Sequence, residues 1–186
     1  FLSAQQVSFS NPINFKDCAL NLFATNFLLD HRLQENRGEI CPGVPQFIQA
    51  LKQLAEPPTL GLLTGNIRLG AKIKLGAHSL WGDWTCGAFA DDHDDRNQLA
   101  RIARDRASRQ LGRRLEGPEI LVIGDTHRDV ECAQAIGAQS LGVCTGGGSP
   151  DELRTAGATW VVSDLREFPM HSLQERLNGS GAPSQR

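Results

Sequence analysis

The chain has 186 residues, of which 40% are hydrophobic, and its 19 basic and 21 acidic side chains give a formal net charge of -2. This length and apolar content fit one main domain with a buried core, and the balanced charge argues against a nucleic-acid or anionic-membrane partner. No run approaches the ~20 apolar residues of a membrane span, and the start lacks a secretory pattern. We therefore expect a cytoplasmic protein with a small, soluble partner or substrate.

The five cysteines are odd in number, widely spaced and without a C-x-x-C pair. This pattern argues against both a disulfide framework and a zinc site, and it is typical of reduced thiols in the cytosol. The first residue is Phe1 rather than Met, which indicates that the sequence is a fragment of the natural product.

The first forty residues predict helical structure. Residues 17–34 place apolar side chains at helical spacing on one face. Residues 41–45 (CPGVP) then interrupt the chain, and a further helix is expected to run to about Leu54.

From about residue 57 onward, short apolar runs alternate with helical patterns, which predicts βαβ units and a parallel sheet. The expected strands are residues 59–63, 119–123, 140–144 and 159–162, and the expected helices are residues 66–80, 95–111, 128–136 and 150–156. A capping box at residues 149–152 sets the start of the last helix. The final nine residues (NGSGAPSQR) predict a disordered tail.

Two carboxylates follow the strand predicted at residues 119–123. Asp125 is placed at the strand tip and Asp129 one helical turn later, so both can face one point at the ligand-binding edge of a parallel sheet. Two oxygen ligands on an open rim suit Mg²⁺ together with water and a substrate phosphate. The alternative is that Asp125 or Thr126 only caps the following helix.

A second polar group, Thr64-Gly65-Asn66, follows the strand predicted at residues 59–63. A hydroxyl, an amide and the free N–H groups at a helix start can hold a phosphate group. The alternative is an ordinary helix cap with a turn glycine.

Together these motifs resemble those of the haloacid dehalogenase (HAD) superfamily, in its phosphoglycolate-phosphatase-like branch. Thr64-Gly65-Asn66 is similar to the second motif of the family, and Gly124-Asp125-Thr126 with Asp129 is similar to the fourth. The similarity extends over roughly residues 42–168, including residues 87–93, 142–147 and 156–165.

The resemblance implies a role for each residue of the site. Asp125 would bind Mg²⁺ directly, Asp129 would support the metal or a cationic residue, and Thr64, Gly65 and Asn66 would hold the phosphoryl group. Arg96 occupies the place of the third-motif lysine, the alternative being a surface arginine among acidic neighbours. Lys72 and Lys74 are expected to be solvated.

The first motif of the family, D-x-D-x-[TV] at the end of an apolar strand, has no counterpart in this sequence. The family's aspartate nucleophile is therefore absent, and we expect the central strand that carries it to be absent too. Residues 1–9 (FLSAQQVSF) are the only N-terminal segment that could pair as a substitute strand. These observations predict an α/β, three-layer, HAD-like (Rossmannoid) parallel sheet with the remnant of a helical cap.

The expected division of the chain is a partial helical cap (1–40), a HAD-like core (41–170) and a C-terminal helix remnant with a disordered tail (171–186). The function implied by the resemblance is Mg²⁺-dependent hydrolysis of a small phosphate monoester through an aspartyl-phosphate. The chain as given is expected to lack this activity without its nucleophile. The alternative is a non-catalytic phosphate-binding or interaction protein on the same fold.

Overall fold

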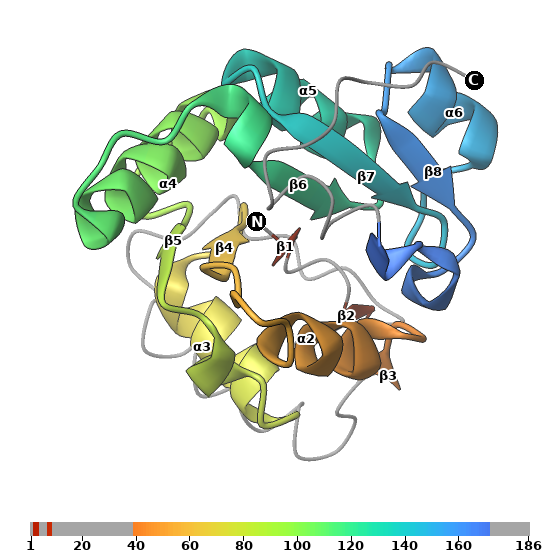
Figure 1. The fold of residues 1–186 in the computed structure, drawn as a ribbon, viewed down its shortest axis with the longest axis horizontal. Coiled ribbons are helices and arrows are strands. Elements are labelled where there is room, and N and C mark those ends of the chain that lie inside the picture. The colour runs from red at the N-terminus through yellow and green to blue at the C-terminus, as the bar shows by residue number, and fades with distance from the viewer. Residues whose placement is uncertain (1, 4–6, 9–38, 172–186) are drawn as a thin grey trace, which may run out of the picture.

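The computed structural model describes residues 2–3, 7–8 and 39–171, and a parallel sheet runs through the middle of this part of the chain (Figure 1). The sheet has six strands in the order β5-β4-β1-β6-β7-β8. Their bounds are β1 Leu2–Ser3, β4 Gly61–Leu63, β5 Cys86–Ala88, β6 Leu121–Gly124, β7 Gln139–Val143 and β8 Trp160–Val162. A separate antiparallel pair joins β2 (Val7–Ser8) to β3 (Glu39–Ile40).

The four strands predicted from apolar runs are confirmed as β4, β6, β7 and β8. Strand β5 was not predicted, because a three-residue strand with glycine at its centre presents no apolar run. Gly87 is needed there, since a Cβ atom would lie 2.6 Å from the backbone oxygen of Leu62 in the neighbouring strand.

Five helices connect the described strands: α2 (Val44–Lys52), α3 (Arg68–Gly76), α4 (Arg96–Leu111), α5 (His127–Ala135) and α6 (Pro150–Thr155). Single 3-10 turns lie at Trp81–Asp83, Gly117–Glu119 and Leu165–Glu167. The capping box of α6 is confirmed, because Ser149 Oγ accepts from the backbone N–H of Glu152 at 3.2 Å while Glu152 Oε2 accepts from the N–H of Ser149 at 2.8 Å.

Helix α3 is shorter than the prediction of residues 66–80. It ends at Gly76, and Ser79 adopts a left-handed conformation with φ of 59°. The backbone N–H of Leu80 then donates to the oxygen of Leu75 at 2.9 Å, which closes the turn and prevents the helix from continuing.

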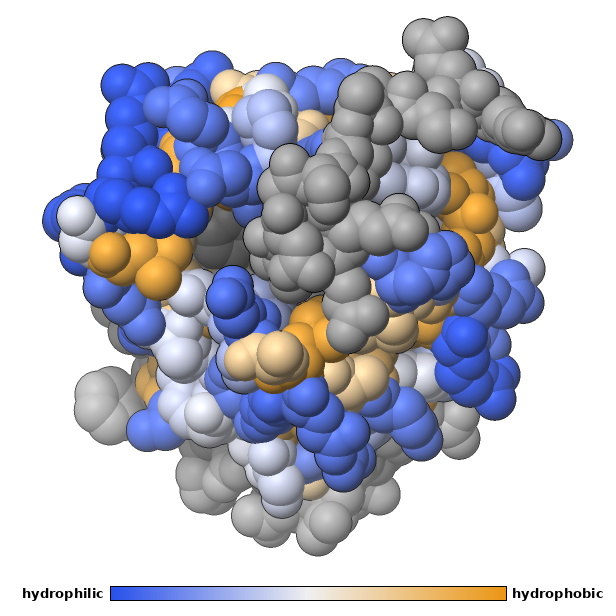
Figure 2. All heavy atoms as spheres, in the orientation of Figure 1, coloured by the Kyte–Doolittle hydropathy of each residue, from blue (hydrophilic) through white to orange (hydrophobic). Residues whose placement is uncertain are grey.

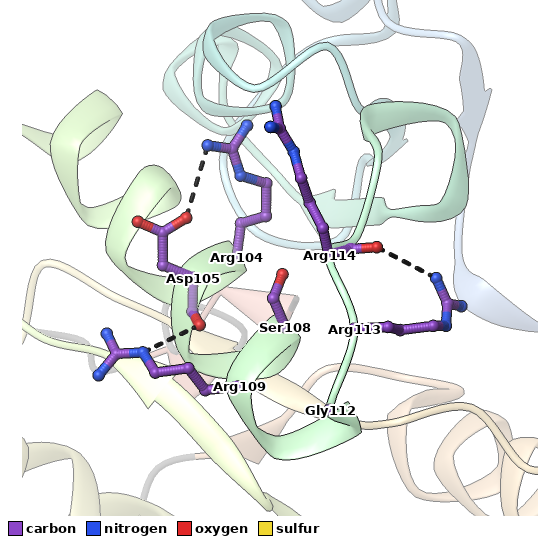
Figure 3. A pocket seen from close by; sticks show the side chains of 7 residues that line it. All are labelled: Arg104, Asp105, Ser108, Arg109, Gly112, Arg113 and Arg114. Carbon is purple, nitrogen blue, oxygen red and sulfur yellow. Dashed lines mark hydrogen bonds and ion pairs between the residues drawn. The ribbon is translucent and has the colours of Figure 1, made fainter.

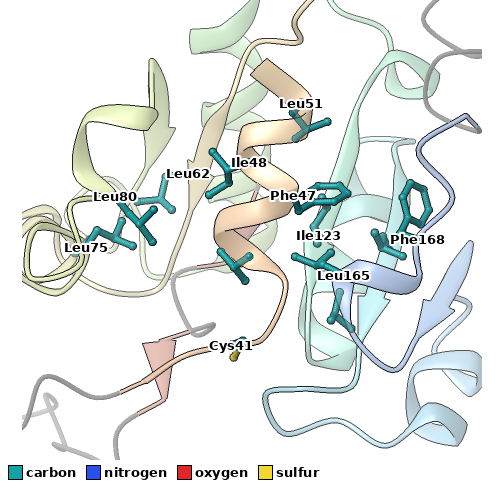
Figure 4. Close-up of a cluster of buried hydrophobic side chains, with 14 of the residues drawn as sticks. Cys41, Phe47, Ile48, Leu51, Leu62, Leu75, Leu80, Ile123, Leu165 and Phe168 are labelled. Atoms are coloured by element: carbon teal, nitrogen blue, oxygen red, sulfur yellow. The ribbon is translucent and has the colours of Figure 1, made fainter. Parts of the chain in front are cut away.

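The sheet separates two hydrophobic clusters, and this makes the fold three-layered. Adjacent residues of one strand enter opposite clusters, as Leu62 and Leu63 do in β4. One cluster packs α2 and α3 on one face (Figure 4), and the other packs α4 and α5 on the opposite face. In Figure 4, Phe47, Ile48 and Leu51 of α2 point toward this first cluster.

The centre of the sheet corrects one expectation. We expected the family's nucleophile-bearing strand to be absent from between the strands of the second and fourth motifs, with residues 1–9 as the only possible substitute. β1 lies there and pairs in parallel with both β4 and β6. It comes from the one N-terminal segment considered as a substitute. Leu2–Ser3 therefore lies in the core sheet rather than in the predicted cap segment, and the strand is only two residues long.

Several predictions fall outside the described residues. These are the helix at residues 17–34, with most of the partial cap, and the tail at residues 178–186. Within the residues that the structure describes, no helix combines the length and the apolar character needed to cross a membrane.

Candidate functional site

Thr64 and Asp125 lie at the same level of the sheet, on either side of β1. The register pairs Leu2 with both Leu62 of β4 and Ile123 of β6, so Thr64 and Asp125 each follow their aligned residue by two positions. Because neighbouring strands are about 4.8 Å apart, the two backbones are separated by about 10 Å. Both side chains are buried, at 1% and 4% exposure.

The Asp125 carboxylate is buried without full hydrogen bonding. Its Oδ1 has no hydrogen-bond partner among the described residues. The loop after β7 approaches it closely, because a Cβ at Gly146 would overlap its carboxylate and a Cβ at Gly148 would overlap its backbone oxygen. Burial, reinforced by the negative charge of Asp129, raises the pKa of the Asp125 carboxyl above its usual range. Such an oxygen is suited to a cation.

Asp129 is fully engaged by protein donors. Its Oδ1 accepts from the guanidinium of Arg96 at 3.0 Å, and its Oδ2 accepts from the backbone N–H and the hydroxyl of Thr126 at 3.1 and 2.8 Å. The Thr126 contacts form a capping box at the start of α5. Gly124 is required here, since a Cβ would overlap the Asp129 side chain. Asp129 is therefore arranged to hold Arg96 and α5.

Arg96 is the first residue of α4, and Asp95 caps that helix by accepting from the N–H of Asn97 at 2.7 Å. The Arg96 side chain is largely buried, at 18% exposure, and its Nε has no hydrogen-bond partner within the described part of the chain. The structure thus brings Arg96 to Asp129, and the buried Nε keeps one donor available at this edge of the sheet.

The Thr64 hydroxyl belongs to a short hydrogen-bonded chain. Thr64 Oγ1 accepts from the backbone N–H and the side-chain amide of Asn66 at 3.0 and 2.9 Å. The ammonium of Lys74 donates to Asn66 Oδ1 at 3.1 Å. Lys74 is half-buried and hydrogen-bonded, so the expectation that this lysine is solvated is wrong, and burial lowers its pKa. Gly65 is exposed between Thr64 and Asn66, with open space where a Cβ would lie.

The segment between β5 and α4 is held by a second acid. Asp92 accepts both guanidinium N–H groups of Arg106 at 2.6 and 2.7 Å and the backbone N–H of Phe89 at 3.0 Å. Hydrogen bonding to Arg106 lowers the pKa of Asp92 below its usual value. The loop is thereby tied to α4, whose first residue is Arg96.

The structure places the predicted site residues in two neighbouring pairs. Asp125 and Thr64 face the same end of the sheet, whereas Asp129 and Arg96 bind one another beside them. No group of three His, Cys, Asp or Glu side chains forms a metal site among the described residues. A cation at Asp125 would therefore need further oxygen ligands from water or a phosphate group, as Mg²⁺ commonly has.

Residues 97–168 match the family model described as HAD-hydrolase-like. This part of the chain is similar to HAD-like hydrolases. The fold of the chain is similar to that of solved HAD-type phosphatases, although no curated protein sequence matches it significantly.

Three solved structures illustrate the similarity. A predicted phosphatase from Clostridium acetobutylicum has a TM-score of 0.62 and 21% identity, over 81% of this chain and 70% of its own. A predicted phosphoglycolate phosphatase from Haemophilus somnus has a TM-score of 0.63 and 17% identity, over 77% and 62%. The β-phosphoglucomutase of Clostridium difficile has a TM-score of 0.64 and 16% identity, over 83% and 64%. The chain thus spans less than two thirds of the latter two proteins.

Proposed function

We propose that Asp125, Thr64 and Asn66 form the Mg²⁺- and phosphate-binding site of a phosphatase acting on small phosphate monoesters. The observation that carries this proposal is the buried Asp125 carboxylate, whose Oδ1 lacks a partner among the described residues and which lies across β1 from Thr64. A charge left in this state costs stability unless a ligand compensates it.

The residues fit a magnesium ion with a phosphate group. Asp125 would be the direct protein ligand, and Asp129, already bonded to Arg96 and Thr126, would support the site from outside. When bound, Mg²⁺ would offset negative charge on the phosphate oxygens. Thr64 and the N–H groups that follow β4 would orient the phosphate, and the Lys74–Asn66 hydrogen bond would fix the amide that contacts the Thr64 hydroxyl.

Turnover in the reaction implied by the resemblance requires an aspartate nucleophile. One carboxylate oxygen forms a bond to phosphorus, the ester oxygen leaves with a proton, and water later cleaves the aspartyl-phosphate. In this sequence β1 is followed by Ala4-Gln5-Gln6, and the first aspartate is Asp17. The second candidate function, phosphate binding without turnover, is favoured by this observation for the 186 residues given.

Calorimetry on the 186-residue protein tests the proposal. Orthophosphate should bind more tightly with Mg²⁺ than with EDTA, and Asp125→Asn should remove the difference. Asp151→Asn, which changes an exposed acid in α6, is the matched control and should retain it. An equal phosphate affinity with and without Mg²⁺ would contradict the assigned site.

A parallel assay with p-nitrophenyl phosphate separates binding from turnover. We expect no hydrolysis above that of Asp125→Asn. Hydrolysis by the wild type that Asp125→Asn abolishes would retain the metal site but show that another residue of this chain supplies the nucleophile.

A further inference from the structure

The surface at the C-terminal end of α4 is strongly basic, in contrast to the whole chain. Residues 101–119 contain six arginines and three acidic residues, whereas the chain has a net charge of -2. Figure 2 shows strongly hydrophilic residues gathered over α4. All the basic side chains in this segment are arginine, whose planar guanidinium pairs with phosphate oxygens through two parallel hydrogen bonds.

Part of this surface forms a hollow of about 690 Å³ (Figure 3). The hollow is an open depression of the surface rather than an enclosed cavity. The hollow is lined by four arginines, one acid and two small residues: Arg104, Arg109, Arg113, Arg114, Asp105, Ser108 and Gly112. The lining therefore carries a net positive charge of three.

Contacts within the protein compensate this charge only in part. Arg113 pairs with Glu119 at 2.7 Å and Arg114 with Glu116 at 3.1 Å, but these arginine side chains are 57% and 79% exposed. Arg104 lies 3.5 Å from the Asp105 carboxylate. Exposed pairs of this kind contribute little to stability, so an anion can compete with them.

Arg109 differs from the other three arginines. Its Nε donates to the backbone oxygen of Asp105 at 3.3 Å rather than to a carboxylate. A cation near the C-terminus of a helix also interacts favourably with the helix dipole. That effect accounts for a basic residue in the last turn, but not for four arginines among the seven residues that line one hollow.

We propose that this hollow binds a small anion with several phosphate groups, of the triphosphate class. The open hollow can admit a compact ligand, the net charge of its lining matches an anion of three or more negative charges, and its arginines match phosphate oxygens. The site is distinct from the strand-end site, because Arg96 and Arg109 are about 20 Å apart along the axis of α4.

Inorganic tripolyphosphate, titrated by calorimetry into the 186-residue protein in the presence of EDTA, tests this site. We expect one tripolyphosphate per chain, bound several-fold more weakly at 200 mM than at 50 mM salt. The double variant Arg104→Gln/Arg109→Gln should lower the affinity at least tenfold, with an unchanged unfolding midpoint. Arg101→Gln, a matched change on the same helix outside the lining, should lower it less than twofold.

Thr64→Val distinguishes this hollow from the strand-end site and should leave tripolyphosphate affinity unchanged. Three results would overturn the proposal: no binding at millimolar tripolyphosphate, an equal loss in Arg101→Gln, or a loss that follows Thr64→Val. Binding of a long polyphosphate or an oligonucleotide without binding of tripolyphosphate would also overturn it, in favour of a polymeric partner.

Discussion

Replacing each of the two buried aspartates with asparagine should change the stability of the metal-free protein in opposite directions. Asp125 Oδ1 is buried without a partner, and an unsatisfied buried polar group costs about 1–3 kcal/mol. A neutral amide avoids part of that cost and the repulsion from Asp129. We therefore expect Asp125→Asn to be more stable than wild type by about 1 kcal/mol at pH 7 without metal.

Asp129→Asn should instead destabilise the protein. The carboxylate is 2% exposed and accepts from Arg96 and from two donors of Thr126. Breaking a buried ion pair by removing one partner costs about 3–5 kcal/mol, because the other charge stays buried. Arg96 is 18% exposed, so water compensates a little, and we expect a loss of about 3 kcal/mol.

Urea unfolding with EDTA and with saturating Mg²⁺ measures both effects. Wild type should gain about 2.7 kcal/mol when Mg²⁺ is at 100 times its dissociation constant, and Asp125→Asn should gain nothing. Asp129→Asn should still respond, with an affinity reduced about 10- to 100-fold. A metal-free Asp125→Asn protein less stable than wild type, or one stabilised by Mg²⁺ as much as wild type, would refute this reasoning.

Three further changes test individual contacts. The pKa of Asp92 is lowered in the folded state, so the stabilisation that this carboxylate contributes is present above its unfolded pKa of about 3.9 and is lost as pH falls. Asp92→Asn should therefore lower the free energy of unfolding in urea by about 1–2 kcal/mol at pH 7, and by progressively less below pH 4. Gly146→Ala places a methyl against Asp125 and should weaken Mg²⁺ binding in calorimetry at least tenfold. Lys74→Met should weaken Mg²⁺-dependent orthophosphate binding about tenfold, because one hydrogen bond to Asn66 is lost. Lys72→Met, at an exposed position of the same helix, is the control. An equal loss of affinity in both variants would contradict a role for Lys74 in orienting Asn66.

The sequence predicted the fold well where local patterns are strong. The run Leu121–Gly124 is apolar and is followed by carboxylates four residues apart, so strand, turn and helix could be placed without tertiary information. The alternating strands and helices likewise predicted a parallel sheet. The short strands β1 and β5 escaped this reasoning because two or three residues form no periodic pattern, and their pairing depends on neighbours far along the chain.

The contacts that organise the candidate site were less accessible to sequence reasoning. Lys74 and Asn66 are eight residues apart, beyond the three- or four-residue spacing from which helix side-chain pairs are recognised. Arg96 and Asp129 are 33 residues apart and meet only because α4 and α5 pack on the same face of the sheet. The resemblance indicated both residues and gave support of a cationic residue as one of two roles for Asp129, but it did not name Arg96 as that residue.

Buried polar atoms without a hydrogen-bond partner lower stability, so they help to locate a ligand-binding site. Four such buried atoms occur among the described residues, and two of them, Asp125 Oδ1 and Arg96 Nε, lie at the ends of β6 and α4 beside the same acid. A fold selected for stability alone would satisfy or remove these groups. Asp129 bonds to Arg96 and to Thr126, the residue after Asp125, so it can hold both neighbours while leaving one oxygen and one donor available. This division gives a physical reason to assign ligand binding to Asp125 and positioning to Asp129, and the opposite signs expected for their asparagine variants follow from it.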